Sequence, residues 1–193
     1  MVLYAYKKKG RYSMKYLIAS DIHGSAYYCQ RLVDSYKTEN ADKIILLGDL
    51  LYHGPRNDLP KDYNPKLVID MLNSLRDDIL CVRGNCDAEI DQMVLSFPIM
   101  ADYAVLPYGA RNIYMTHGHI YNEDRLPPIK KGDILLNGHT HIAKYTLHDD
   151  YVYINPGSCS IPKENTHHGN MTLEDNILQW KNFENEIIMT LDI

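Results

Sequence analysis

Short apolar runs recur along the first two thirds of the chain, and polar, turn-forming segments separate them. The length of these runs and their branched residues are typical of buried strands. The runs are residues 15–20, 43–48, 79–83, 112–116 and 133–137. Farther on, residues 144–155 alternate as a hairpin that turns at Asp149-Asp150, and residues 170–193 alternate as an antiparallel meander.

Two amphipathic helices are predicted between the first three strands. Residues 25–40 carry apolar side chains at helical spacing, namely Cys29, Leu32, Val33 and Tyr36. The second helix follows a polar, proline-rich segment, with Asn64 as its cap and Pro65 at its first position. Its buried stripe is Val68, Met71, Leu72 and Leu75. Early helices between strands and late antiparallel strands together predict a mixed α/β fold.

The length of 193 residues fits one domain, which we expect to span residues 14–193. Residues 1–13 lack the basic-then-apolar order of a secretion signal, and we expect them to be a disordered extension of a cytoplasmic protein. Four cysteines without Cys-x-x-Cys spacing predict neither a disulfide framework nor a zinc–thiolate site.

The net charge of −5 provides no basic surface for a nucleic-acid polymer or an anionic membrane. No apolar run reaches the roughly 20 residues that a membrane-spanning helix needs. We therefore expect the partner to be a small molecule.

Side chains with metal-binding chemistry follow each of the five predicted strands. Because the ligand site of an α/β sheet lies beyond the carboxyl ends of its strands, we expect these side chains to meet at one rim. Asp21 and His23 follow the first strand, and Asp49 and His53 follow the second. Asn85, Cys86 and Asp87 follow the third. His117 and His119 follow the fourth, and His139 and His141 follow the fifth.

Each of these motifs has an ordinary structural explanation when it is taken alone. Asp-x-His after a strand commonly forms a turn with a helix cap, and His-x-His commonly lies in a solvated loop. However, six of the nine histidines fall in these strand-end segments, and the joint pattern indicates a site. For the other three, His148, His167 and His168, the structural explanation is favoured.

The donor types indicate which ions such a site would bind. Carboxylate, imidazole and amide donors, with no thiolate required, suit divalent ions such as Mn²⁺, Fe²⁺ or Zn²⁺. Seven candidate donors exceed one tetrahedral site but suit two ions that share a carboxylate, whose two oxygens can reach both. Paired ions about 3.5–4 Å apart activate water for in-line displacement in phosphatases and nucleases.

At these positions the chain resembles the calcineurin-like metallophosphoesterases. The shared motifs are Asp21-x-His23, Gly48-Asp49, Gly84-Asn85, His117-Gly118-His119 and Gly138-His139-Thr140-His141, which lie between residue 14 and about residue 160. Within that superfamily, the segments GNCD (84–87), YHGPRNDLP (52–60) and NPGSCSIPKE (155–164) are similar to those of the small bacterial YfcE-type phosphodiesterases.

The resemblance implies a four-layer αββα sandwich of two mixed β-sheets flanked by helices, with two metals at its rim. The implied ligands of one ion are Asp21, His23, Asp49 and His141, and those of the other are Asp49, Asn85, His117 and His139. Asp49 would be the bridge. The implied reaction is hydrolysis of a phosphoester by a metal-bound hydroxide, with no covalent enzyme intermediate. Mn²⁺ is the expected ion, with Fe²⁺, Zn²⁺ and Ni²⁺ as alternatives.

Cys86 departs from the wider family, in which many members have His after the Asn and that imidazole is thought to assist the leaving oxygen. A thiol, with an unperturbed pKa of about 8.5, cannot replace an imidazolium as a general acid. We therefore expect Cys86 to lie near the substrate and to favour aryl or otherwise activated phosphodiesters. His53 or a metal-bound water is the alternative proton donor.

Several residues near the motifs have structural explanations as well. Asp87 either orients the ligand His23 or caps a short helix over residues 88–95. Residues 155–158 are expected to form a rigid turn that supports the site, and Arg83 to be a buried structural partner.

Three more side chains either face the substrate or are simply solvated. His53 and His119 are expected near the substrate phosphate, and Arg56 is a candidate partner of a phosphate oxygen. The alternative for each is an exposed loop position.

The expected activity is that of a dinuclear-metal-dependent phosphodiesterase acting on a small substrate, with homo-oligomerisation left open. A phosphomonoesterase or nucleotidase with the same site is the first alternative. A retromer-like protein-binding scaffold is the second, and the complete donor set for two ions argues against it.

Overall fold

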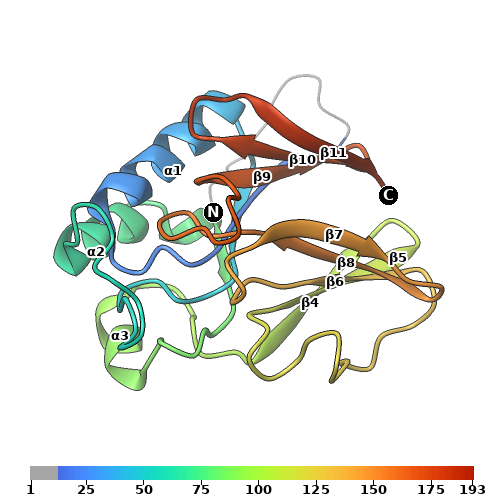
Figure 1. Cartoon of the computed structure of the whole chain (residues 1–193), viewed down its shortest axis with the longest axis horizontal. Coiled ribbons are helices and arrows are strands. Elements are labelled where there is room, and N and C mark those ends of the chain that lie inside the picture. The colour runs from blue at the N-terminus through green and yellow to red at the C-terminus, as the bar shows by residue number, and fades with distance from the viewer. Residues whose placement is uncertain (1–12) are drawn as a thin grey trace, which may run out of the picture.

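The computed structural model describes residues 13–193, and Figure 1 shows its arrangement. Residues 1–12 lie outside the described part of the chain, so the expectation for residues 1–13 can be followed only at Ser13. The hydroxyl of Ser13 donates a hydrogen bond to Asp175.

The strands form two mixed sheets that pack face to face (Figure 1). The first sheet contains β1 (Tyr16–Ala19), β2 (Lys43–Leu46), β3 (Ile79–Cys81), β9 (Gly169–Glu174), β10 (Ile177–Asn182) and β11 (Ile187–Asp192). Its order is β11-β10-β9-β1-β2-β3. The strands β1, β2 and β3 are parallel, and β9 pairs antiparallel with β1 before continuing into β10 and β11. The predicted C-terminal meander is confirmed.

The second sheet has parallel strands at its centre and an antiparallel strand at each edge. It contains β4 (Tyr103–Tyr108), β5 (Arg111–Thr116), β6 (Asp133–Leu136), β7 (Ala143–Leu147) and β8 (Tyr151–Pro156). Its order is β4-β5-β6-β8-β7. The predicted hairpin is the β7–β8 pair. The edge strand β4 was not predicted from the sequence.

Both predicted helices are present, and a side chain caps the start of each; Leu75, the last residue of the stripe predicted for the second helix, lies beyond its end. In α1 (Ala26–Glu39), the Ser25 hydroxyl accepts a hydrogen bond from the N–H of Tyr28. In α2 (Pro65–Asn73), the Asn64 side chain accepts from the N–H of Leu67. A 3₁₀ turn η1 (Arg76–Asp78) and a short helix α3 (Glu89–Val94) complete the described helices. No helix within residues 13–193 is long and apolar enough to cross a membrane.

Successive residues of β1 face two different cores, as the period of a strand requires. Leu17 and Ala19 pack with α1 and α2 on the outer face of the first sheet. Ile18 faces the second sheet and packs in the core between the sheets. That inner core also holds Leu136, Ile154 and Trp180. The two cores fix the strands whose ends carry the candidate donors.

The expected two-sheet α/β sandwich is confirmed, and its fourth layer is a loop rather than a helix. Residues 117–132 cover the outer face of the second sheet, where Ile129 packs against Tyr114, Tyr151 and Tyr153. The Tyr114 hydroxyl donates to the carbonyl of Pro128 at 2.8 Å. Adjacent prolines at 127 and 128 explain the lack of a helix, because proline removes a helical hydrogen bond.

Candidate metal centre

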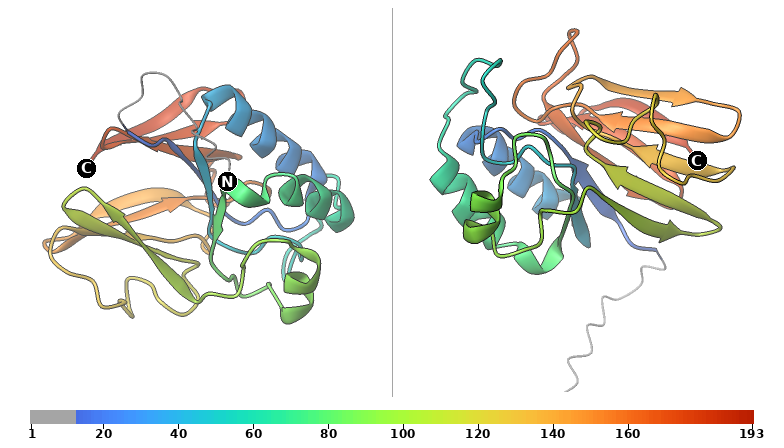
Figure 2. Two further views of the ribbon diagram at one scale, coloured as in Figure 1. Left: turned by 180° about the vertical axis from the view of Figure 1, so that it is seen from behind. Right: turned by 90° about the horizontal axis from the view of Figure 1, so that it is seen from below.

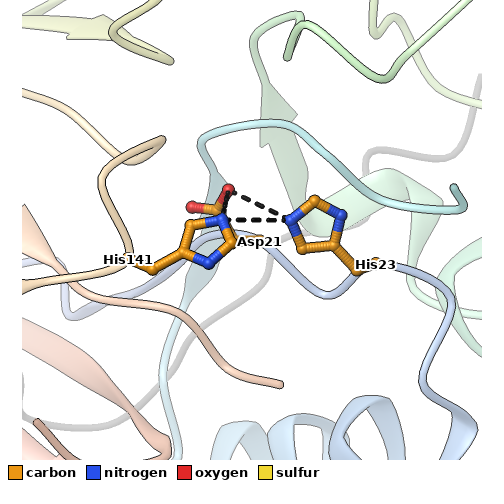
Figure 3. A group of neighbouring side chains, drawn as sticks. All are labelled: Asp21, His23 and His141. Atoms are coloured by element: carbon orange, nitrogen blue, oxygen red, sulfur yellow. Dashed lines mark hydrogen bonds and ion pairs between the residues drawn. The ribbon is translucent and has the colours of Figure 1, made fainter. Parts of the chain in front are cut away.

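The carboxyl ends of β1, β2, β3, β5 and β6 lead into the candidate donors, so both sheets contribute to one rim. Three of the donors form a compact first group, shown in Figure 3. Nε2 of His141 lies 3.1 Å from Oδ1 of Asp21 and 3.2 Å from Nε2 of His23. Nε2 of His23 lies 3.5 Å from the same carboxylate oxygen. Residues more than a hundred positions apart thus present three donor atoms to one point.

A second group lies beside the first and comes from β3, β5 and β6. Nε2 of His117 lies 3.0 Å from Oδ1 of Asn85 and 3.2 Å from Nδ1 of His139. Asn85, His117 and His139 are three of the donors predicted for the second ion.

Asp49 lies between the two groups. Its Oδ2 atom is 3.7 Å from Nε2 of His23 and 3.4 Å from Nε2 of His117. Its Oδ1 atom instead accepts a hydrogen bond from the N–H of Cys86 at 2.8 Å. The expectation that one oxygen would serve each ion is therefore wrong, because a single oxygen faces both groups.

Backbone carbonyls orient three of the imidazoles. Nδ1 of His23 donates to the carbonyl of Tyr52, Nδ1 of His117 to that of Leu47, and Nδ1 of His141 to that of Ile161, at 2.7–2.8 Å. A carbonyl can only accept, so Nδ1 carries a proton and Nε2 is the ring nitrogen that faces the site. Such bonds commonly fix metal-binding histidines.

The electrostatics of these groups fit divalent ions. Oδ1 of Asp21 is buried, and Nε2 of His141 and Nε2 of His23 lie 3.1 and 3.5 Å from it. Either a proton on an imidazole or a metal cation between these atoms balances the buried carboxylate charge.

The pKa values show the same demand for positive charge. Burial acts to raise the pKa of Asp21, but contacts with His141 and His23 outweigh it and hold the pKa well below its usual range. Burial acts to lower the pKa of His117, but its contact with Asp49 raises the pKa to about 9. The carboxylates are thus ionised. Their negative charge favours protons on the neighbouring imidazoles, and a divalent ion would compete with those protons.

The backbone at the donors is strained. Five of the seven candidate ligands have left-handed φ angles between 50° and 65°, namely Asp21, His23, Asp49, His139 and His141. Residues with a Cβ disfavour this region, and such strain concentrates at functional sites. At Gly84, the close approach of two loops requires glycine, because a Cβ there would overlap the carboxylate and backbone nitrogen of Asp49.

The end of β8 and the turn after it support the rim, although residues 155 and 156 of the predicted turn belong to the strand. Asn155 donates from Nδ2 to the carbonyl of Gly138 at 2.7 Å, and the hydroxyls of Ser158 and Ser160 donate to the carbonyl of Asp21 at 2.8 and 3.0 Å. Sequence reasoning missed these serine contacts, as well as the Ser20 hydroxyl that donates to Oδ2 of Asp21 at 2.5 Å. In the sequence, the turn expected at the end of the strand was the only indication of these serine contacts.

Comparison with known proteins identifies the family. Residues 14–176 match the model of the calcineurin-like phosphoesterase superfamily domain. The chain belongs to that superfamily. The resemblance carried by the strand-end motifs is thereby confirmed, and so is the prediction of a phosphoesterase.

Relatives of this phosphoesterase include well-characterised folds. It is 41% identical to phosphodiesterase YfcE of Escherichia coli over 150 residues, which are 78% of this chain and 82% of that protein. The solved structure of YfcE, a phosphoesterase from E. coli, matches with a TM-score of 0.90 and 37% identity, covering 93% of this chain and all of that one. Vps29 from Entamoeba histolytica, in complex with Zn²⁺, shares the fold alone, with a TM-score of 0.62 and 21% identity over 93% of this chain and 99% of that one.

A cavity of about 460 Å³ opens onto the candidate metal centre of the phosphoesterase. Cys86 lies on its wall, with Asp49 and Asn85 beside it. Burial raises the pKa of the Cys86 thiol, and the neighbouring Asp49 raises it further. The thiol therefore stays protonated at neutral pH and is not poised as a nucleophile.

Asp87 has neither of the roles that the sequence indicated. Its carboxylate accepts hydrogen bonds from the N–H groups of Asp49, Leu50 and Gly84 at 2.7–2.9 Å. Both ring nitrogens of His23 face other groups, and α3 has Ala88 rather than Asp87 at its N-cap. Asp87 instead joins the loops after β2 and β3 and so positions Asp49.

Neither of the two histidines predicted to face the substrate lines the cavity. The His53 ring packs edge-on against Tyr52 and Tyr63, with centroids 4.8 and 5.3 Å apart, and does not line the cavity. The His119 ring lies against those of His117 and His139 and also stays outside the cavity wall, and burial lowers its pKa to about 4. The His53 ring is used in packing against other aromatic rings. A substrate role for His119 stays a prediction.

The cavity wall contains one predicted cation and one that sequence reasoning missed. Arg56, a candidate phosphate partner, lines the cavity, and so does Lys163. Arg83 is half-buried rather than fully buried, and its Nη2 donates to Asp102 at 2.6 Å.

Two of the three histidines assigned a structural explanation have one. Nε2 of His148 donates to Glu123 at 3.0 Å and the ring stacks on Tyr151, and His168 stacks on Tyr28. For His167 the explanation stays a prediction.

Proposed function

We propose that this phosphoesterase hydrolyses small phosphodiesters with two divalent ions, of which Mn²⁺ is the first candidate. One observation carries the proposal. Oδ2 of Asp49 lies within 3.7 Å of histidines from two separate donor groups, and a site for one ion would need only one of them. The open cavity beside Asp49 leaves room for a substrate.

In this proposal, Asp21, His23, Asp49 and His141 would hold one ion, and Asp49, Asn85, His117 and His139 would hold the other. When bound, the ions supply a reactive water at neutral pH and positive charge against the phosphoryl oxygens.

The residues of the chain prepare this site before the substrate arrives. The hydrogen bond from Cys86 N–H fixes Oδ1 of Asp49 and so directs Oδ2 toward the two groups. Carbonyls hold the imidazoles with Nε2 facing the site. Such preorganisation avoids reorganisation during the reaction.

Cys86 is the basis for proposing activated diesters. A protonated, neutral thiol gives a departing oxygen little of the help that an imidazolium would give. Substrates whose leaving oxygen is already stable as an anion, such as aryl phosphodiesters, need that help least. The name of the YfcE relative, a phosphodiesterase, agrees with a diester substrate.

Removal and return of metals test the proposal. The chain is stripped with a chelator, reloaded with Mn²⁺, Fe²⁺, Zn²⁺, Ni²⁺ or Mg²⁺, and assayed with bis(4-nitrophenyl) phosphate and 4-nitrophenyl phosphate. We expect activity to return with two bound ions per chain and the diester to be hydrolysed faster. Faster hydrolysis of the monoester would favour a phosphomonoesterase, and no turnover with any ion would favour a scaffold.

The substitution Cys86→His tests the role of the thiol. We expect the diesterase-to-monoesterase ratio to change by roughly tenfold or more, because general acid catalysis commonly contributes at least that much. Steady-state kinetics on the two nitrophenyl substrates measure the ratio. Cys86→Ser is the matched control, since it keeps a small neutral donor, and it should leave the ratio close to that of the wild type. An unchanged ratio in Cys86→His would remove the link between this position and substrate choice.

A further inference from the structure

The cavity beside the candidate metal centre has two cations that metal binding does not use. Arg56 and Lys163 both line it, together with Asn57 and Thr140. Within residues 13–193, neither Arg56 nor Lys163 has a carboxylate partner. Unpaired cations on the wall of a cavity provide charge for an anionic ligand.

The loop that carries Arg56 is fastened to the first donor group. The carbonyl of Tyr52 accepts the hydrogen bond from Nδ1 of His23. Five residues later, Asn57 closes the loop, donating from its backbone N–H to the carbonyl of Gly54 and from Nδ2 to that of His53. Arg56 therefore occupies a turn whose position is set relative to a proposed metal ligand.

The loop that carries Lys163 is fastened in the same way to a different ligand. Nδ1 of His141 donates to the carbonyl of Ile161, and the N–H of Lys163 donates back to the carbonyl of His141 at 3.0 Å. The Thr166 hydroxyl then donates to the carbonyl of Lys163 at 2.8 Å. In the right-hand view of Figure 2, the two loops project from the same side of the molecule.

We propose that Arg56 and Lys163 bind a second anionic group of the substrate, one that lies beyond the phosphate being hydrolysed. This inference rests on the proposed phosphodiesterase activity and names its substrate class. That class is a phosphodiester in which an esterified group carries a further phosphate or carboxylate.

Charge supports a second group rather than a second contact to the first. Two divalent ions held by Asp21 and Asp49 already outweigh the single charge of a diester. Two additional cations would match another anion, and arginine in particular presents paired donors to phosphate or carboxylate. The cavity volume of about 460 Å³ lies in the range of small-ligand pockets, which exceed the size of one phosphate.

A pair of chromogenic substrates that differ by one phosphate tests the inference. They are thymidine 5′-(4-nitrophenyl phosphate) and its 3′-phosphorylated form, which have the same scissile bond and leaving group. We expect the wild type to prefer the 3′-phosphorylated form by about tenfold in kcat/KM, mainly through KM, as expected for a charged hydrogen bond. In Arg56→Gln/Lys163→Gln the preference should fall to about one.

The double variant Arg76→Gln/Lys131→Gln is the matched control, because it removes the same charge at exposed positions outside the cavity. It should keep the preference of the wild type. Calorimetry provides a readout other than turnover: the metal-loaded wild type should bind thymidine 3′,5′-bisphosphate more tightly than thymidine 5′-phosphate, and Arg56→Gln/Lys163→Gln should bind the two alike.

Three results would overturn the inference. Equal losses on both substrates in Arg56→Gln/Lys163→Gln would assign the two cations to the scissile phosphate. If the wild type hydrolysed both substrates without preference, the proposed second anionic group would be ruled out, while the proposed phosphodiesterase activity would still be supported. Hydrolysis of neither with any divalent ion would overturn the proposed function as well.

Discussion

The two oxygens of the Asp49 carboxylate have different partners, and this difference makes the residue hard to replace. Oδ1 accepts from the N–H of Cys86, and Oδ2 faces His23 and His117. The N–H groups that Asp87 binds include that of Asp49, so the backbone is held as well as the side chain. One residue thus connects both donor groups to the loop after β3.

Replacement of Asp49 by Asn should weaken the binding of both ions together. If the amide oxygen keeps the bond to Cys86 N–H, the amide NH₂ faces the two donor groups and repels cations. We expect roughly tenfold or greater loss of affinity for each ion. Metal titration and elemental analysis of the purified variant measure it, with Asp149→Asn on the β7–β8 turn as the control. Loss of one ion with full retention of the other would contradict the shared position of Asp49.

The places of the candidate donors could be predicted from the sequence, but most of the contacts that support them could not. Each donor directly follows an apolar run, so the end of a strand predicts its location. The three backbone partners of Asp87 come from loops that meet only in the folded chain. Lys163 shows no sequence feature that separates it from an ordinary solvated lysine.

At the scale of elements, one carboxylate connects α1 to the first sheet. Glu39, in the last turn of α1, lies 2.6 Å from Nζ of Lys15, just before β1, and 2.7 Å from Nζ of Lys181 in β10. The side chains of all three residues are at most 13% exposed. Burial acts to raise the pKa of Glu39, but the two lysines outweigh it and lower the pKa.

Replacement of Glu39 by Gln should destabilise the fold in a pH-dependent way. Since the folded-state pKa is lowered, the stabilisation is present above the unfolded pKa of about 4.3 and is lost as the pH falls below it. We expect a loss of about 2 kcal/mol in the free energy of unfolding at pH 7, because Lys181 loses its carboxylate partner and Lys15 keeps, within residues 13–193, only Glu174, at 3.5 Å. The loss should shrink at pH 3.5. Urea unfolding at the two pH values measures it.

The control for Glu39 is Glu184→Gln. Glu184 pairs with Arg31 at 3.0 Å but is 68% exposed, so its removal should cost less than about 0.5 kcal/mol. Equal costs for the two variants, or a cost for Glu39→Gln that does not change with pH, would contradict the role of the buried ion pairs.

Helices and central strands were predicted well because each has a local signal. Ser25 and Asn64 cap α1 and α2, and buried strands are continuous apolar runs. The edge strand β4 has alternating exposure and contains Pro107, which is typical of an edge and weakens its pattern. The loop layer over residues 117–132 depends on packing against the second sheet, which the sequence does not indicate.

At the scale of the whole molecule, a buried hydrogen bond joins the two sheets behind the rim. Nε1 of Trp180, in β10, donates to the carbonyl of Asn155, in β8, at 2.7 Å. The Trp180 side chain is fully buried between the sheets. Asn155 in turn holds the carbonyl of Gly138, next to the ligand His139. The core is thereby connected to the site.

Replacement of Trp180 by Phe should lower both stability and metal affinity. The variant loses the hydrogen bond and leaves a void, so we expect a decrease of about 2–3 kcal/mol in the free energy of unfolding. Urea unfolding and metal titration measure the two effects. Tyr114→Phe is the control, because it also loses a hydrogen bond to a carbonyl, that of Pro128, but on the outer face of the second sheet. Equal metal affinities in the two variants would show that the connection does not reach the site.

The left-handed backbone at five of the proposed ligands has a consequence for any attempt to redesign the chain. Each such residue costs about 1 kcal/mol or more, and glycine or asparagine would fit the same angles with less strain. Glycine provides no donor, and asparagine cannot replace an imidazole. Local backbone preference and metal chemistry therefore require different amino acids at the same positions. A sequence optimised for folding alone would gain stability there and lose the site.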